Sequence, residues 1–144
     1  KAARPYRMTP RADAAAATGE RILDAAVELV WANSFDLTLR EVAQRAGVSE
    51  QTVIRRFGGK DELLAAAGRR EFERVAEQRD TATAGDLPQA ISVLVDHYEQ
   101  HGERVLLMLV SEDRLESIRE ITDRGRDYHR EWCERVFQEA LHDL

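Results

Sequence analysis

The stretch TLREVAQRAGVSEQTVIRRFGGKDELL, which starts at Thr38, constrains the fold more than any other part of the chain. Thr38 and Glu41 have the spacing of a capping box, which starts a helix. Apolar residues then recur at helical spacing until Gly47, a residue that accepts the positive φ found at helix ends. Ser49 is a favourable N-cap for a second short helix, expected over residues 49–57. Two short helices joined by a tight glycine-containing turn predict a helix-turn-helix.

The second helix of this motif is expected to have one apolar and one polar face. Val53 and Phe57 lie on the apolar face, which we expect to pack on the first helix. The opposite face has amide, hydroxyl and guanidinium groups, which are the groups that read base edges or bind phosphate. These are Gln51, Thr52, Arg55 and Arg56. We interpret this face as a DNA-binding surface. The alternative is a generic helical hairpin with a solvated polar face.

Residues 18–64 resemble the DNA-binding domain of the TetR (tetracycline-repressor) family of bacterial transcriptional regulators. The resemblance includes the preceding segment GERILDAAVELVWANSF and the following segment GGKDELL. It implies an all-α fold, with a three-helix helix-turn-helix head and a helical effector-binding body. Matched position by position, it implies DNA contacts at Thr38, Ser49, Gln51, Thr52, Ile54, Arg55, Arg56 and Lys60. The chain departs from the family pattern at Ile54 and Arg56, where an aromatic residue and a histidine are common, and at Glu50.

The resemblance also implies a function. It suggests a sequence-specific regulator, specifically a repressor that a small-molecule effector releases from double-stranded operator DNA. A homodimer in the bacterial cytoplasm, associated with the nucleoid, is the form expected to read a palindromic operator. Two alternatives stay open. One is a helical protein-interaction module that has lost DNA binding, and the other is a metal or thiol sensor.

The charge distribution favours DNA binding by one part of the chain. The net charge is −6, but residues 1–60 contain ten Lys and Arg against seven Asp and Glu, a net of +3. Residues 61–144 contain eleven against twenty, a net of −9. We therefore expect only the basic part to meet phosphate. No apolar run approaches the length that spans a bilayer, so no membrane partner is expected.

We expect three parts in the chain: a flexible basic arm over residues 1–17, the DNA-binding head over 18–64, and the regulatory body over 65–144. The arm has the composition of a disordered leader, although a basic arm in the minor groove is an alternative. Relatives usually have two further helices that pair subunits, and nothing here resembles them, so the body is expected to be incomplete. The alternative is a shortened member of the family that dimerises differently. The loop over 79–85 is the clearest shift in composition and suggests a boundary.

The remaining helices are predicted from apolar periodicity, caps and breakers. Gly102 is expected to end one of them, and the all-apolar run RVLLMLV to form a buried helix. The expected helices outside the helix-turn-helix cover residues 18–33, 60–78, 87–101, 104–110, 115–121 and 123–144.

Five residues of the body are candidates for an effector cavity that takes an apolar or aromatic compound. They are Tyr98, Met108, Tyr128, Trp132 and Phe137. The alternative for each residue is ordinary core packing.

Two pairs of residues have the helical spacing of metal ligands, His97 with His101 and His129 with Cys133. No short-spaced cysteine pair accompanies them, so polar positions on helix surfaces are the simpler interpretation, and we predict no metal or other cofactor. No Ser/His/Asp set, phosphate loop or paired carboxylate site stands out, so the sequence does not indicate an enzyme.

Overall fold

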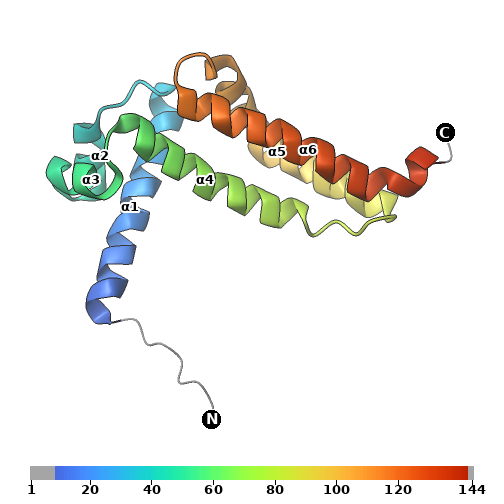
Figure 1. Ribbon diagram of the computed structural model, residues 1–144, viewed down its shortest axis with the longest axis horizontal. Coiled ribbons are helices and arrows are strands. Elements are labelled where there is room, and N and C mark those ends of the chain that lie inside the picture. The colour runs from blue at the N-terminus through green and yellow to red at the C-terminus, as the bar shows by residue number, and fades with distance from the viewer. Residues whose placement is uncertain (1–8, 143–144) are drawn as a thin grey trace, which may run out of the picture. The chain divides into compact units, whose positions relative to one another are not determined.

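The computed structural model describes residues 9–142, with side chains up to residue 140. Within this range the chain forms six helices and no strand, which confirms the prediction of an all-α protein. Figure 1 shows their course. The helices are α1 (Pro10–Asn33), α2 (Leu39–Ala46), α3 (Glu50–Phe57), α4 (Lys60–Arg79), α5 (Leu87–Ser111) and α6 (Glu116–His142).

The chain divides into two compact units, Lys1–Leu63 and Leu64–Leu144. The division falls inside α4, which continues from one unit into the other without a break. The loop over 79–85, which composition suggested as a boundary, lies within the second unit, where the N–H of Gly85 donates to the carbonyl of Val136 at 3.3 Å.

The first unit is built by α1 packing on α2 and α2 packing on α3. Apolar side chains from all three helices and from the α1–α2 connection are buried between them. The buried set is Ile22, Leu23, Ala25, Ala26, Val30, Phe35, Leu37, Val42, Ala43, Ala46 and Val53. Burying this set is the main favourable term in forming the unit, because helices of eight residues are not stable alone.

The turn between α2 and α3 has the geometry that the sequence predicts. Gly47 is the C-cap of α2 with φ of 69°, in the left-handed region. The N–H of Val48 donates to the carbonyl of Ala43 at 3.0 Å, which closes the end of α2. Ser49 then caps α3, its side chain accepting from the N–H of Thr52 at 3.2 Å. The two caps fix where each short helix ends and begins.

The start of α1 differs from the prediction. The helix begins at Pro10, with Thr9 as its N-cap, so residues 10–17 are helical and exposed and do not form a flexible arm. Residues 1–8 of the predicted arm lie outside the described residues. Thr18, the first residue of the predicted helix, lies inside α1, where its hydroxyl donates to the carbonyl of Ala14 at 3.0 Å. A proline at the first helical position is a favourable start, since its missing N–H needs no partner there.

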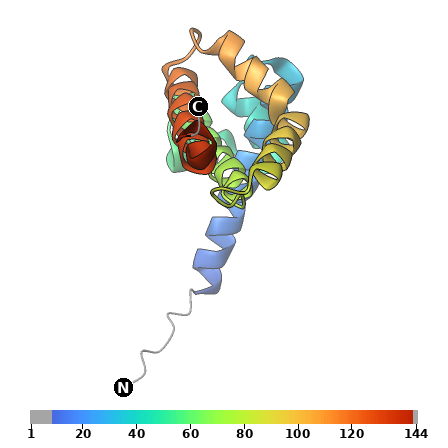
Figure 2. The ribbon, with the colours of Figure 1, turned by 90° about the vertical axis from the view of Figure 1, so that its right-hand side faces the viewer.

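The second unit contains α5, α6 and most of α4, and Figure 2 shows α6 nearly end-on. Two predicted breaks are absent. Gly102 lies inside α5, and the segments predicted as 115–121 and 123–144 form the single helix α6. A single glycine costs only about 1 kcal/mol in a helix, which the packing of α5 on α6 offsets.

The core of this unit is centred on Trp132, which is 1% exposed, with Ala82, Ala90 and Val136 around it. The predicted buried helix over 104–110 is wrong. That run is the last part of α5, and its side chains Leu106 and Val110 are 62% and 80% exposed.

We expect Gly47→Ala to lower the free energy of unfolding of the first unit by about 1 kcal/mol, because a side chain in the left-handed region is strained. Gly102→Ala is the control. Its added Cβ would meet no atom within 4 Å, so it is expected to raise stability by up to about 1 kcal/mol through helix propensity. Urea unfolding followed by circular dichroism measures both. A neutral or stabilising Gly47→Ala would contradict the turn geometry.

Candidate nucleic-acid interface

The outer face of α3 is a solvent-facing surface with the chemistry of a DNA-reading helix. Val53 is fully buried and holds α3 on α2, which turns the opposite side of the helix outward. Gln51, Arg55 and Arg56 are exposed, and Ile54 is 41% exposed, although it is apolar. An exposed aliphatic side chain between amide and guanidinium groups is suited to contact a thymine methyl group.

Thr38 lies at the N-terminus of α2 in a complete capping box. Its backbone N–H donates to Oε2 of Glu41 at 2.7 Å, and the N–H of Glu41 donates to the hydroxyl oxygen of Thr38 at 3.2 Å. The Thr38 hydroxyl also donates to Oε2 of Glu41 at 2.9 Å. The backbone and the side-chain hydrogen bonds that Thr38 donates to this carboxylate lower the pKa of Glu41. The box fixes the position of an exposed hydroxyl beside the positive end of the α2 dipole, where a phosphate oxygen is stabilised.

Ser49 and Thr52 pair with each other at the start of α3, with 2.8 Å between their hydroxyl oxygens. Lys60, the first residue of α4, is half-buried. In the same turn the N–H of Gly59 donates to Oε2 of Glu62 at 2.9 Å. The predicted contact residues of the helix-turn-helix therefore lie on α3 or at helix N-termini, which are the places where nucleic-acid-binding helices present donors to phosphate.

Arg56 differs from Arg55 in what it contacts. A Cβ built on Gly19 of α1 would lie 2.7 Å from Nε of Arg56, so the guanidinium rests on the α1 backbone where only glycine leaves space. Arg21 also links α1 to the motif, with Nε donating to the carbonyl of Ala46 at 3.5 Å. Sequence reasoning missed both, because a glycine in mid-helix and an arginine on α1 have no motif signal.

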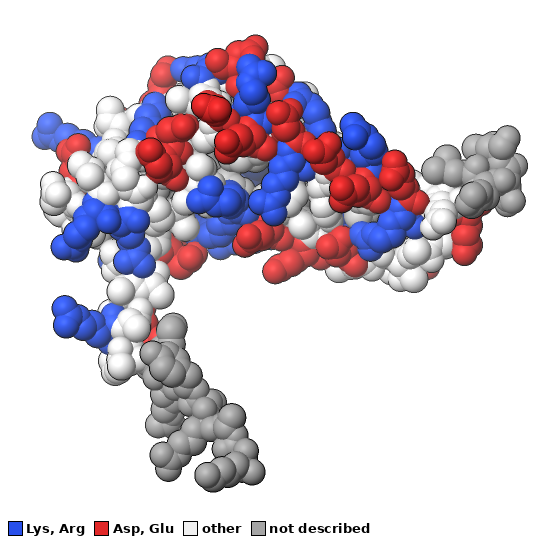
Figure 3. All heavy atoms as spheres, viewed as in Figure 1, with Lys and Arg blue, Asp and Glu red and all other residues white. Residues whose placement is uncertain are grey.

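Other arginines of the first unit are exposed on α1 and α2. Arg45 pairs with Glu28 at 2.6 Å, and both side chains are more than half exposed. Arg40 is also exposed on α2. In Figure 3, acidic and basic side chains lie close together over α4 to α6, as expected for a surface that does not attract DNA.

The five predicted effector residues lie at different places in the second unit. Trp132 and Phe137 pack edge to face at 5.9 Å in the core, and Tyr128 packs against the same cluster. Tyr98 is 48% exposed on α5. Met108 lies ten residues further along α5, about 15 Å away along the helix axis, and is half-buried.

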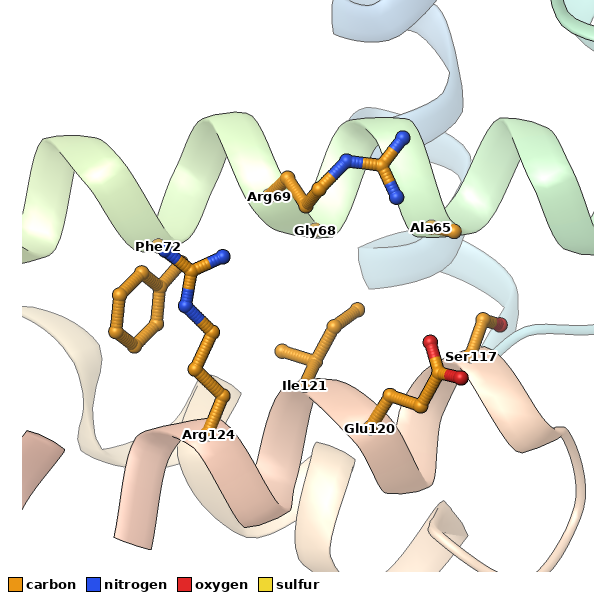
Figure 4. A pocket seen from close by; sticks show the side chains of 8 residues that line it. All are labelled: Ala65, Gly68, Arg69, Phe72, Ser117, Glu120, Ile121 and Arg124. Atoms are coloured by element: carbon orange, nitrogen blue, oxygen red, sulfur yellow. The ribbon is translucent and has the colours of Figure 1, made fainter. Parts of the chain in front are cut away.

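A pocket of about 110 Å³ lies between α4 and α6 and has a different lining (Figure 4). It forms beside the close crossing at Gly68, where an added Cβ would lie 2.0 Å from Cδ1 of Ile121. None of the five predicted effector residues lines it. Its lining is Ala65, Gly68, Arg69, Phe72, Ser117, Glu120, Ile121 and Arg124. Its volume is well below the roughly 300 Å³ of small drug-binding pockets.

The histidines and the cysteine that suggested a metal sensor are close together in pairs. The rings of His97 and His101 have centroids 5.4 Å apart, and Nε2 of His129 lies 3.6 Å from Sγ of Cys133. Within the described residues, no three His, Cys, Asp or Glu side chains are placed to hold a metal ion. In the same part of the chain, no helix is both long and apolar enough to cross a membrane.

The geometry of α2, the Gly47 turn and α3 defines a helix-turn-helix domain of the DNA-binding class. Residues 22–67 match the family model described as "Bacterial regulatory proteins, tetR family". A relative, the "HTH-type transcriptional repressor KstR" of Mycolicibacterium smegmatis, is 39% identical over 71 residues, which are 48% of this chain and 35% of the relative. No solved structure gives a significant match.

The helix-turn-helix region of this chain is therefore similar to the bacterial regulatory proteins of the tetR family, in agreement with the resemblance seen in the sequence. The matched region spans about a third of the length of this curated relative, and the family model ends soon after the start of α4.

We expect Gly19→Ala to weaken DNA binding by up to about tenfold, since the added methyl group would displace the Arg56 guanidinium from α1. Stability should change little, because the displaced atoms are the far end of a flexible side chain. The measurement is fluorescence anisotropy with duplex DNA, alongside thermal unfolding. Ala15→Gly, an exposed change on the same helix, is the control. Unchanged affinity for Gly19→Ala would show that the position of Arg56 against α1 does not matter.

Proposed function

We propose that this chain is a repressor that binds operator DNA through α3 and leaves it when a small-molecule effector occupies the second unit. The observation that carries the proposal is the α3 surface: polar and basic side chains face outward because Val53 is buried on α2. The relative is named as a transcriptional repressor, which supports repression over activation.

In this proposal the residues of the interface have two roles. Gln51, Ile54 and Arg55 read base edges, while Thr38 and Lys60 bind phosphate at the N-termini of α2 and α4. Ser49 and Thr52 place their hydroxyls at the start of α3, and Arg56 holds α3 against α1 or contacts the backbone. Phosphate contacts supply affinity, and base contacts supply the choice of sequence.

The chain changes from a basic head to an acidic body at the beginning of α4. This helix is the element through which effector binding in the body is proposed to change DNA binding by the head. α4 starts with the phosphate-binding Lys60 and continues through the second unit to Arg79. An effector that prefers one orientation of α4 shifts the population of DNA-competent chains by its differential affinity. A homodimer in the cytoplasm, associated with the nucleoid, is the state in which two α3 helices read a two-fold operator.

Binding to the DNA that flanks the chain's own gene, titrated with salt, tests the proposal. We expect specific binding with a two-fold footprint and a log–log salt slope set by the number of phosphate contacts. Scrambled DNA of equal length is the control. Equal affinity for both duplexes would contradict an operator-reading role and favour the alternative of a protein-interaction module.

Substitutions separate the two roles within the interface. Arg55→Ala is expected to cost about 1–3 kcal/mol on the operator and much less on scrambled DNA, because a base contact is lost. Lys60→Ala is expected to weaken both complexes similarly and reduce the salt slope by about one. Electrophoretic mobility shift assays at several salt concentrations measure this. An equal loss on both duplexes for Arg55→Ala would make Arg55 a phosphate contact.

A further inference from the structure

The last residue of α4, Arg79, is a buried cation in the core of the second unit. The residue is 3% exposed. Its guanidinium carbon lies 4.3 Å from the ring centroid of Trp132 and 5.5 Å from that of Tyr128. Its carbonyl accepts from Nε1 of Trp132 at 2.9 Å. The backbone at the end of α4 and the guanidinium are therefore both held by one indole ring.

No carboxylate of the described residues forms an ion pair with Arg79 within 4 Å. The nearest acidic neighbour along the chain, Asp80, is occupied elsewhere: its Oδ1 accepts from the Tyr128 hydroxyl at 2.9 Å and from Arg135 at 2.7 Å. The guanidinium forms a hydrogen bond with the ring of His129, with 3.0 Å between Nη2 of Arg79 and Nδ1 of His129.

The three histidines of this cluster all have lowered pKa values. Burial, together with the positive charge of Arg79, lowers the pKa of His97 to about 4 and also lowers the pKa of His129. Burial lowers the pKa of His101 as well, with Arg104 adding to this and Glu71 opposing it. Tyr98, Tyr128 and Cys133 complete the surroundings, and burial raises the pKa of Tyr128 to about 12. The carboxylate that favours the charged form of Arg79 is that of Asp80, which is bound to Tyr128 and Arg135 and forms no ion pair with the guanidinium.

Two buried nitrogen atoms in this cluster lack a hydrogen-bond partner in the described structure, Nε of Arg79 and Nδ1 of His97. The His97 residue is 5% exposed. Buried polar groups are normally paired, and a buried charge without a counter-ion costs several kcal/mol. A guanidinium edge and an imidazole N–H are the donors that bind the two oxygens of a carboxylate.

We propose that Arg79 and His97 bind the carboxylate of an organic acid, which is the effector of the second unit. The role of this acid as an effector rests on the proposed function. The binding site itself is argued from the contacts of the cluster alone. Tyr98 covers the cluster from the solvent side: it is 48% exposed, and its ring centroid lies 5.0 Å from that of His97 and 6.5 Å from that of His129. In this proposal Tyr98 moves to admit the acid, whose apolar part then packs against the aromatic rings.

Benzoate is the probe, and benzamide, its uncharged analogue of nearly equal shape, is the matched control. Isothermal titration of the full chain at pH 7 is expected to show saturable benzoate binding and at least tenfold weaker benzamide binding. Inorganic phosphate is titrated as a second anion, to test whether the site prefers a carboxylate. Phosphate that binds as tightly as benzoate would overturn the carboxylate assignment.

The histidine titration gives a readout that does not need a variant. Burial is the largest cause of the low pKa of His97, and the charge of Arg79 is the next. A bound carboxylate neutralises that charge, so saturating benzoate should move this pKa upward from about 4. NMR titration of the imidazole C–H signals measures the shift. An unchanged His97 pKa at benzoate saturation would overturn the assignment.

Variants locate the site. Arg79→Met is expected to remove benzoate binding, and Arg79→Lys to weaken it at least tenfold, because the charge stays while the two-pronged donor is lost. Arg130→Met removes an arginine that is 69% exposed on α6 and should bind benzoate as the parent does. If Arg79→Met does not fold, the melting temperature of the parent chain is measured instead. It is expected to rise with benzoate and not with benzamide.

The two proposals fail in different ways. A chain that binds its operator but shows no benzoate binding overturns the carboxylate site and leaves the proposed function. A chain that binds benzoate through Arg79 but binds no DNA overturns the proposed function and leaves the site.

Discussion

The complete burial of Val53 against α2 is the contact on which the DNA-binding surface depends. α3 has only eight residues, too few for a stable helix on its own. Its orientation therefore comes from one fully buried valine, from the Ser49 cap and from the left-handed turn at Gly47. Once Val53 points inward, helical geometry places Gln51 and Arg55 outward without further information. Loss of this contact would remove the interface, even though Val53 is not part of it.

The second unit is organised by a different kind of contact, between a cation and aromatic rings. Trp132 stacks on the Arg79 guanidinium and also donates to the Arg79 carbonyl. Such stacking suits arginine because its planar, weakly hydrated group loses less on burial than an ammonium would. The end of α4 is thereby tied to the middle of α6. A ligand bound here, as we propose, would contact the end of the helix that begins at Lys60.

Local signals were sufficient to predict the helix-turn-helix. Caps, a positive-φ glycine and apolar spacing all operate within about ten residues, and each appears where the sequence indicates. The errors arose where local and long-range terms compete. Gly102 suggests the end of a helix, but the packing of α5 on α6 keeps that helix intact. The first helix was predicted to start at Thr18, whereas Thr9 with Pro10 forms the better start. The buried environment of Arg79 had no sequence signal, since a basic residue before a polar loop normally faces solvent.

The continuity of α4 has a consequence for how heads and bodies of such proteins can be exchanged. The boundary between Leu63 and Leu64 lies within a helix, so the residues on its two sides share one helical register. Each residue inserted there rotates the following residues of α4 by about 100° about the helix axis and advances them by about 1.5 Å. Seven inserted residues nearly restore the original phase, whereas one does not. A chimaera of two such regulators must therefore match helical register at the join, and adding length to the connection cannot substitute for it.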